Sequence, residues 1–137
     1  MTNKEWSPDE LKSKAERYCA SAEHCESEVR LKLLQWRGDA QTVDKIVGSL
    51  RVSGYVDDER YARAFVHDKV AFQGWGRVKI EYMLRAKKLP LPVIKSALKT
   101  IDEIEYFEQL SHLLETKSFN ALLLRGFTAE EIKQCQS

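Results

Sequence analysis

Hydrophobic residues recur every three or four positions along almost the whole chain, which is the spacing of amphipathic helices. The first such run comprises Leu11, Ala15, Tyr18 and Cys19. It follows the stretch from Ser7 to Glu10, which has the form of a capping box with proline at the first helical position. We therefore expect a helix to begin directly after Ser7.

Two further helices are predicted before residue 55. One carries Val29, Leu33 and Trp36, is expected to be capped by Ser27, and is broken at residues 37–39. The next carries Val43, Ile46, Val47 and Leu50 and ends at Ser53-Gly54. Glycine tolerates the left-handed conformation in which many helices end.

Three more helices follow between residues 57 and 101. The fourth is capped by Asp57 or Asp58 and is expected to place one set of residues on one face: Tyr61, Ala62, Phe65, Lys69 and Phe72. The fifth spans about 77–88 with Ile80, Met83, Leu84 and Lys87 inward, and the sixth follows Pro90 and Pro92 with Val93, Ile94, Ala97, Leu98 and Ile101. Other aromatic residues are also expected in the core: Tyr82, Tyr106, Phe107, Phe119 and Phe127.

The apolar pattern repeats along the chain. Val29 and Leu33 align with Ile80 and Leu84 at the same offset of 51 positions that aligns residues 43–50 with residues 94–101. A third copy aligns residues 122–128 with residues 84–90 at an offset of 38, which indicates that a dozen or so residues are absent near Thr116 to Phe119. Either the third repeat is naturally short or a mobile loop is missing from it. The sequence predicts an all-α fold of tandem three-helix repeats forming an elongated, curved array, with repeats at 7–54, 55–101 and a short 102–137.

Charge is balanced overall but unevenly distributed. The 137 residues include 22 Lys and Arg against 21 Asp and Glu. Between Lys69 and Lys99, however, Glu81 is the single acidic residue among eight basic ones, and the balance reverses from Asp102 to Glu131. Arg77, Arg85 and Lys88 fall on one side of the fifth helix, which could follow a ridge of negative charge. An ordinary solvated stripe with weak ion pairs to Glu81 is the alternative.

Cysteine and histidine usage argues against an enzyme or a metal protein. Three cysteines without a secretory or membrane-spanning stretch favour a cytoplasmic protein. Cys19, His24 and Cys25 could be drawn as zinc ligands, but no fourth ligand has suitable spacing. No histidine comes with a carboxylate and a nucleophile in a recognisable order, and residues 74–77 lack the residues of a phosphate-binding loop. We expect no catalysis, no cofactor and no metal.

A specific set of residues resembles the RecX regulatory proteins. The central match is the run from Gly54 to Ala62 with Phe65 and Val66. This run includes Asp58 and Tyr61. The other matching residues are Ser27, Glu28, Val29, Lys32, Leu33, Gly74, Gly76, Arg77, Ile80, Leu84, Arg125, Gly126 and Phe127. The sequence departs from the family at residues 24–26, where an arginine-rich stretch is usual, and in its short third repeat.

The resemblance implies a three-repeat protein that binds filaments of the recombinase RecA on single-stranded DNA and lowers their ATPase and strand-exchange activities. We expect a monomer with no membrane partner. The basic residues expected to contact the filament, or DNA directly, are Arg63, Lys69, Arg77, Lys79, Arg85, Lys87 and Lys88. Trp75 is expected to fold back as a plug between repeats rather than to stack on a base. A helical-repeat scaffold for another protein and a DNA-binding module independent of RecA are the alternatives.

Overall fold

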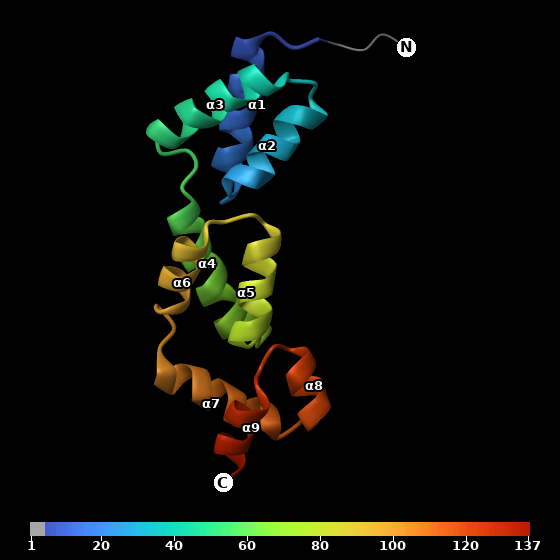
Figure 1. Cartoon of the computed structure of the whole chain (residues 1–137), viewed down its shortest axis with the longest axis vertical. Helices are drawn as coiled ribbons and strands as arrows, with labels where there is room; N and C mark the ends of the chain where they lie inside the picture. The colour runs from blue at the N-terminus through green and yellow to red at the C-terminus, as the bar shows by residue number, and fades with distance from the viewer. Residues whose placement is uncertain (1–4) are drawn as a thin grey trace. The chain divides into compact units, whose positions relative to one another are not determined.

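The computed structural model describes residues 5–137, and every regular element in that range is helical (Figure 1). This confirms the all-α prediction. The elements are α1 (Pro8–Ser21), α2 (Glu26–Gln35), α3 (Ala40–Val52), α4 (Asp58–Asp68), the π-helix η1 (Lys69–Gln73), α5 (Arg77–Ala86), α6 (Leu91–Leu98), α7 (Glu103–Leu114), α8 (Phe119–Leu124) and α9 (Ala129–Gln136). The chain divides into two compact units, one ending at Tyr61 and the other running from Ala62 to Ser137.

In the first unit, α1, α2 and α3 pack against one another. Their shared core contains Leu11, Ala15, Val29, Leu33, Val43, Ile46, Val47, Leu50 and Val56, as the apolar spacing predicted. The capping box of α1 is also confirmed, because Ser7 Oγ accepts from the Glu10 amide at 3.1 Å and Glu10 Oε1 accepts from the Ser7 amide at 3.0 Å. Burial of these apolar side chains is the main force holding the three helices together.

The predicted cap of α2 was wrong. Cys25, not Ser27, precedes the helix, and Ser27 lies within its first turn. The amide of Cys25 donates to Glu28 Oε1 at 3.1 Å, and the amide of Glu26 donates to Asp58 Oδ1 at 2.9 Å. The helix starts earlier than expected because a carboxylate distant in sequence satisfies one of its first amides. At the start of α4, Asp57 Oδ1 accepts from the Arg60 amide at 3.1 Å, so Asp57 is the residue that caps this helix.

In the second unit, α5 packs on α6, while α7, α8 and α9 pack on one another. The second group encloses Tyr106, Leu110, Leu122, Phe127 and Ile132. The apolar residues predicted to face inward from α5 and α6 include four that are buried: Ile80, Leu84, Ile94 and Ala97. Burial is therefore confirmed at these four aligned positions, whereas Leu98 and Ile101 are half-buried.

One turn occurs three times at the predicted offsets. Arg37, Lys88 and Gly126 each follow a helix in the left-handed conformation, with φ of 68°, 61° and 97°. Two residues later, Asp39, Pro90 and Thr128 stand at the N-cap of the next helix. The same backbone geometry at offsets of 51 and 38 shows that the helix pairs are structural repeats.

The shortening of the third repeat is distributed differently from the prediction. It is not a gap near Thr116 to Phe119, where α7 and α8 are joined by residues 115–118. Instead α7 has 12 residues where α4 and η1 have 11 and 5, and α8 has 6 where α5 has 10. These two helices are each about one turn shorter than their counterparts, which accounts for part of the difference between the two offsets.

Two aromatic residues predicted in the core are exposed. Phe72 is 74% exposed because the π-helical turn η1 breaks the 3.6-residue spacing that placed it beside Phe65. Tyr82 is 70% exposed because it lies two residues from both Ile80 and Leu84, and so on the opposite side of α5. Local helix geometry, rather than residue type, decides which aromatic side chains are buried.

Candidate functional site

The start of α5 is held by residues from much later in the chain. The amide of Gly76 donates to the Arg125 carbonyl at 2.7 Å, and that of Val78 donates to the Gly126 carbonyl at 3.1 Å. Between them, the Arg77 amide donates to Tyr106 Oη at 3.1 Å. The first amides of a helix have no partner within it, so these three contacts complete the N-terminus of α5.

The residue types of the motif Arg125-Gly126-Phe127 are explained by its contacts near the start of α5. Gly126 has φ of 97°, and a Cβ there would lie 2.4 Å from Lys79 Cβ and 2.5 Å from the Lys79 amide nitrogen. Arg125 donates from Nη1 to the Gln73 carbonyl at 2.9 Å, at the end of η1. Phe127 is buried beside Tyr106, with ring centroids 5.5 Å apart. These residues are structural.

Arg77 is occupied within the protein. Its Nη1 pairs with Glu131 Oε2 at 3.1 Å, its Nη2 pairs with Glu103, and its guanidinium lies 4.0 Å from the centre of the Tyr106 ring. Burial raises the pKa of Tyr106, so its hydroxyl stays neutral and accepts from the Arg77 amide. Two carboxylates already offset the charge that Arg77 was expected to offer a partner.

Trp75 folds back onto its own unit. Its ring meets Phe65 edge to face at 6.3 Å, and Lys69 Nζ and Lys79 Nζ lie 5.0 and 4.2 Å from its centre. A cation over an indole is an attractive contact. Lys69 and Lys79 are therefore brought together at Trp75, and both are partly buried.

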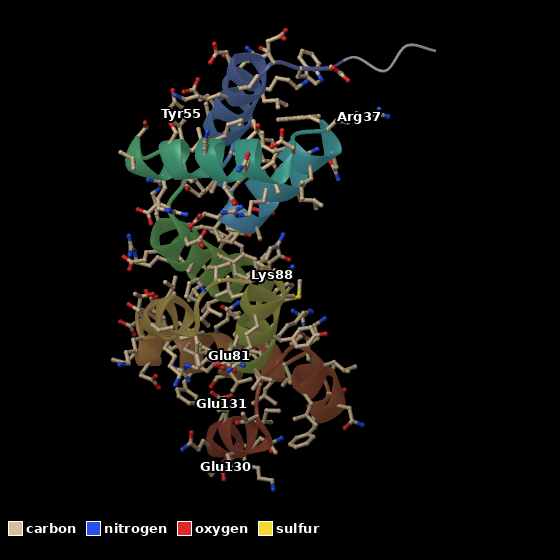
Figure 2. All side chains as sticks on the ribbon, turned by 45° about the horizontal axis from the view of Figure 1, so that its top comes forward. Arg37, Tyr55, Glu81, Lys88, Glu130 and Glu131 are labelled. Atoms are coloured by element: carbon tan, nitrogen blue, oxygen red, sulfur yellow. The ribbon has the colours of Figure 1, made fainter. Side chains whose placement is uncertain are left out.

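Two exposed candidate residues lie where α5 ends, Arg85 and Lys88, which we call the basic end of α5; Lys87 between them is half-buried. Arg85 is more than half exposed and has a 3.6 Å contact with Glu81, an exposed pair of little strength. Lys88 is exposed and is one of the two non-glycine residues with positive φ in residues 5–137. Figure 2 shows Lys88 at this end of α5 and Glu131 on α9. The negative end of the helix dipole lies at the same point, where cations are favoured.

The seven basic candidates do not form one surface. Arg77 lies at the start of α5, Lys69 and Lys79 cover Trp75, and Arg63 is exposed on α4 beside α7. Arg85 and Lys88 at the basic end of α5 remain as the charges of this set that are open to a partner.

Arg37 was not among the basic residues that the sequence analysis selected as candidates for contact with a partner. It is exposed, has positive φ, and occupies in the first unit the position that Lys88 occupies in the second. The offset of 51 could have identified it.

The residues of the central motif, from Gly54 to Phe65, also make contacts within the fold. Gly54 has φ of 79° and follows the end of α3, and Ala62 at the end of this segment is fully buried. The pKa of Tyr61 is raised, first by burial and then by the nearby carboxylate of Glu28, so Tyr61 belongs with the first unit rather than with the core of the second. Phe65 is half-buried against Trp75.

The described residues offer no metal site. Between residues 5 and 137, no three His, Cys, Asp or Glu side chains are grouped so that they could hold a metal ion. His24 stacks on Tyr18 with ring centroids 3.8 Å apart, and its Nδ1 lies 3.4 Å from Glu28 Oε1. Within the same range, no helix has the length and apolar character needed to cross a membrane.

The fold and its repeated turn define a protein of tandem three-helix repeats. Residues 57–98 match the family model described as RecX, second three-helix domain. Over 136 residues the chain is 26% identical to the regulatory protein RecX of Leptothrix cholodnii, covering 90% of this chain and 85% of the relative. Over 97 residues it is 34% identical to that of Clostridium botulinum, covering 71% of this chain and 44% of the relative.

A solved structure has the same fold. The crystal structure of RecX from Lactobacillus salivarius superimposes with a TM-score of 0.85 at 19% identity, and the match covers 94% of each chain. The chain belongs to the RecX family of regulatory proteins.

Proposed function

We propose that this protein binds RecA filaments on single-stranded DNA and lowers their ATPase and strand-exchange activities. The family supports regulation of RecA in general. The observation that carries the proposal for this chain is the basic end of α5, where Arg85 and Lys88 are exposed and where the ion pair of Arg85 with Glu81 is weak.

The physical basis is attraction between this group and the negative charge of a nucleoprotein filament. Lysine and arginine side chains displace counterions from phosphates, and they also pair with acidic protein side chains. The left-handed conformation of Lys88 adds a second argument. Glycine adopts it at lower cost, as Gly126 does in the third repeat, so lysine at this position costs some stability.

The test is RecA's own ATP hydrolysis on single-stranded DNA, measured with increasing amounts of wild type and of Arg85→Glu/Lys88→Glu. We expect the wild type to inhibit hydrolysis and the double variant to need roughly tenfold or more protein for the same effect. Arg77 is left intact because its ion pairs stabilise the fold.

The matched control is Lys117→Glu/Lys133→Glu, which reverses two exposed charges in the acidic C-terminal region. It should inhibit as the wild type does. If a stoichiometric excess of wild type changes neither hydrolysis nor strand exchange, the proposed function is wrong. If both double variants inhibit fully, the contact lies elsewhere on the protein.

Direct binding to single-stranded DNA is a second candidate, favoured by Tyr82. This side chain is 70% exposed on α5, three residues before Arg85. An exposed aromatic ring beside a cation is the arrangement on which unpaired bases stack. Titration of bare DNA at several salt concentrations distinguishes the two, because tight, salt-sensitive binding that Tyr82→Ala weakens and that shows no preference for filaments would favour this candidate.

A further inference from the structure

A groove in the second unit lies apart from the basic end of α5. It has a volume of about 760 Å³ and runs between α4 with η1 on one side and the start of α7 on the other. Its apolar lining includes Val66, Val70, Phe72 and Ile101. A cleft of this size with an apolar lining is a typical binding site.

The π-helical turn makes the groove apolar. Residues 69–73 form η1, and within it Phe72 turns outward to line the groove, 74% exposed, with its ring 6.4 Å from that of His67. Single π turns in α-helices are frequent at functional sites. The turn thus gives the groove an aromatic anchor point.

The wall formed by α7 is acidic. Asp102, Glu105 and Glu108 line it. Asp102 is committed to capping α7, since its Oδ1 accepts from the Glu105 amide at 3.0 Å. Within residues 5–137, the side chains of Glu105 and Glu108 have no ion-pair partner, and both residues are exposed. Two unpaired carboxylates beside an apolar floor select a ligand that is both apolar and positively charged.

We infer that this groove binds an amphipathic helix of a protein partner, with apolar side chains against Phe72 and lysine or arginine toward Glu105 and Glu108. An apolar groove between two helices commonly receives such a segment. Arg63 on α4 also lines the groove, but the carboxylates of Glu105 and Glu108 outnumber it, so this surface is chemically distinct from the basic end of α5. The inference goes beyond the proposed function and does not depend on it.

The experiment selects peptides from a random helical library displayed on phage, using the full chain as bait. Enriched peptides are then measured individually by fluorescence anisotropy. We expect them to carry an apolar stripe flanked by lysine or arginine, and to lose roughly tenfold or more in affinity with Phe72→Ala and with Glu108→Lys. Their affinity should also fall with added salt.

Matched controls make the test specific. Tyr82→Ala removes a similarly exposed aromatic ring from α5, and Glu130→Lys reverses an exposed charge on α9. Both should bind the selected peptides as the wild type does. Because Phe72 and Glu108 are exposed, their replacement should leave the melting temperature unchanged.

Three results would overturn the inference. The first is enrichment of acidic or uncharged peptides, or of none that depends on Phe72. The second is self-association that Phe72→Ala abolishes, which would make a second copy of the chain the occupant. The third is binding of single-stranded DNA that Glu108→Lys strengthens and Phe72→Ala weakens, which would place nucleic acid in the groove.

Discussion

The backbones of Gly76 and Gly126 lie in contact. A Cβ on Gly76 would come 2.3 Å from both the carbonyl carbon and the carbonyl oxygen of Gly126. Real Cβ atoms do not approach backbone so closely, and backbone cannot give way as the end of a flexible side chain can. Glycine is therefore required at residue 76 by space, and at residue 126 by both space and its positive φ.

Replacing Gly76 by alanine should lower the free energy of unfolding by about 1–3 kcal/mol, the usual cost of forcing extra atoms into a packed site. Gly48→Ala is the control, because Gly48 lies within α3 and a Cβ there meets nothing within 4 Å. This control should instead gain roughly 1 kcal/mol from better helix propensity. Urea unfolding measures both, and equal effects of the two substitutions would contradict the close contact.

Tyr106→Phe should destabilise the second unit by about 1–3 kcal/mol, the cost of leaving a buried polar group without a partner. The hydroxyl of Tyr106 accepts from the Arg77 amide at 3.1 Å and lies 3.3 Å from Glu131 Oε1. Its removal leaves the amide at the start of α5 without an acceptor, beside a ring that is fully buried. Tyr82→Phe, the same change on an exposed ring, should have almost no effect in thermal unfolding. A melting temperature unchanged in Tyr106→Phe would show that the hydroxyl is dispensable.

Asp58→Asn should change the pH dependence of stability. Burial raises the pKa of Asp58, although the Glu26 amide bonded to it acts in the opposite direction. A carboxyl group whose pKa is raised on folding stabilises the protein below its unfolded pKa, and this contribution is lost as pH rises through the folded pKa. Asparagine keeps an oxygen that can accept from the Glu26 amide and does not titrate.

The stability advantage of the Asp58→Asn variant over wild type should therefore be largest near pH 7 and should shrink as pH falls through the pKa of Asp58. Urea unfolding of both proteins between about pH 3 and pH 7 measures the difference in their free energies of unfolding. Groups that titrate alike in both proteins contribute equally to each, so their contributions cancel in this difference. An advantage that grows on acidification would mean that the pKa of Asp58 is lowered.

Lys88→Gly should separate stability from binding. Glycine adopts the left-handed conformation of residue 88 more cheaply than lysine, so the free energy of unfolding should rise by about 1 kcal/mol. Under the proposed function, filament binding should weaken at the same time. Lys95→Gly, within α6, removes a similar exposed charge and should lower stability by roughly the same amount. A variant at residue 88 that loses stability would argue against backbone strain there.

The fold was predictable from the sequence because the signals that specify it are local. Apolar spacing identified the buried faces of α2, α3, α5 and α6, and the offset of 51 related them to one another. The three-fold recurrence of the turn at Arg37, Lys88 and Gly126 is the backbone counterpart of that offset. The repeat boundaries at 54 and 101 stay predictions.

The functional surface was less predictable, because it depends on contacts between distant residues. Charge counting placed Arg77 with Arg85 and Lys88, but the carboxylates that neutralise Arg77 lie 26 and 54 positions later. The π-helical turn that exposes Phe72 has no signal in the spacing of apolar residues, which continues through it. The pattern of charges along one helix does not show which of them already form ion pairs with side chains of another helix.

The completion of α5 by the turn after α8 has a consequence for how the protein is made. Residues 76–78 leave the ribosome before Arg125 and Gly126 are synthesised, a delay on the order of seconds. During that interval three amides at the head of α5 have only water as a partner. We therefore expect the middle of the nascent polypeptide to reach its final form only after translation has nearly finished.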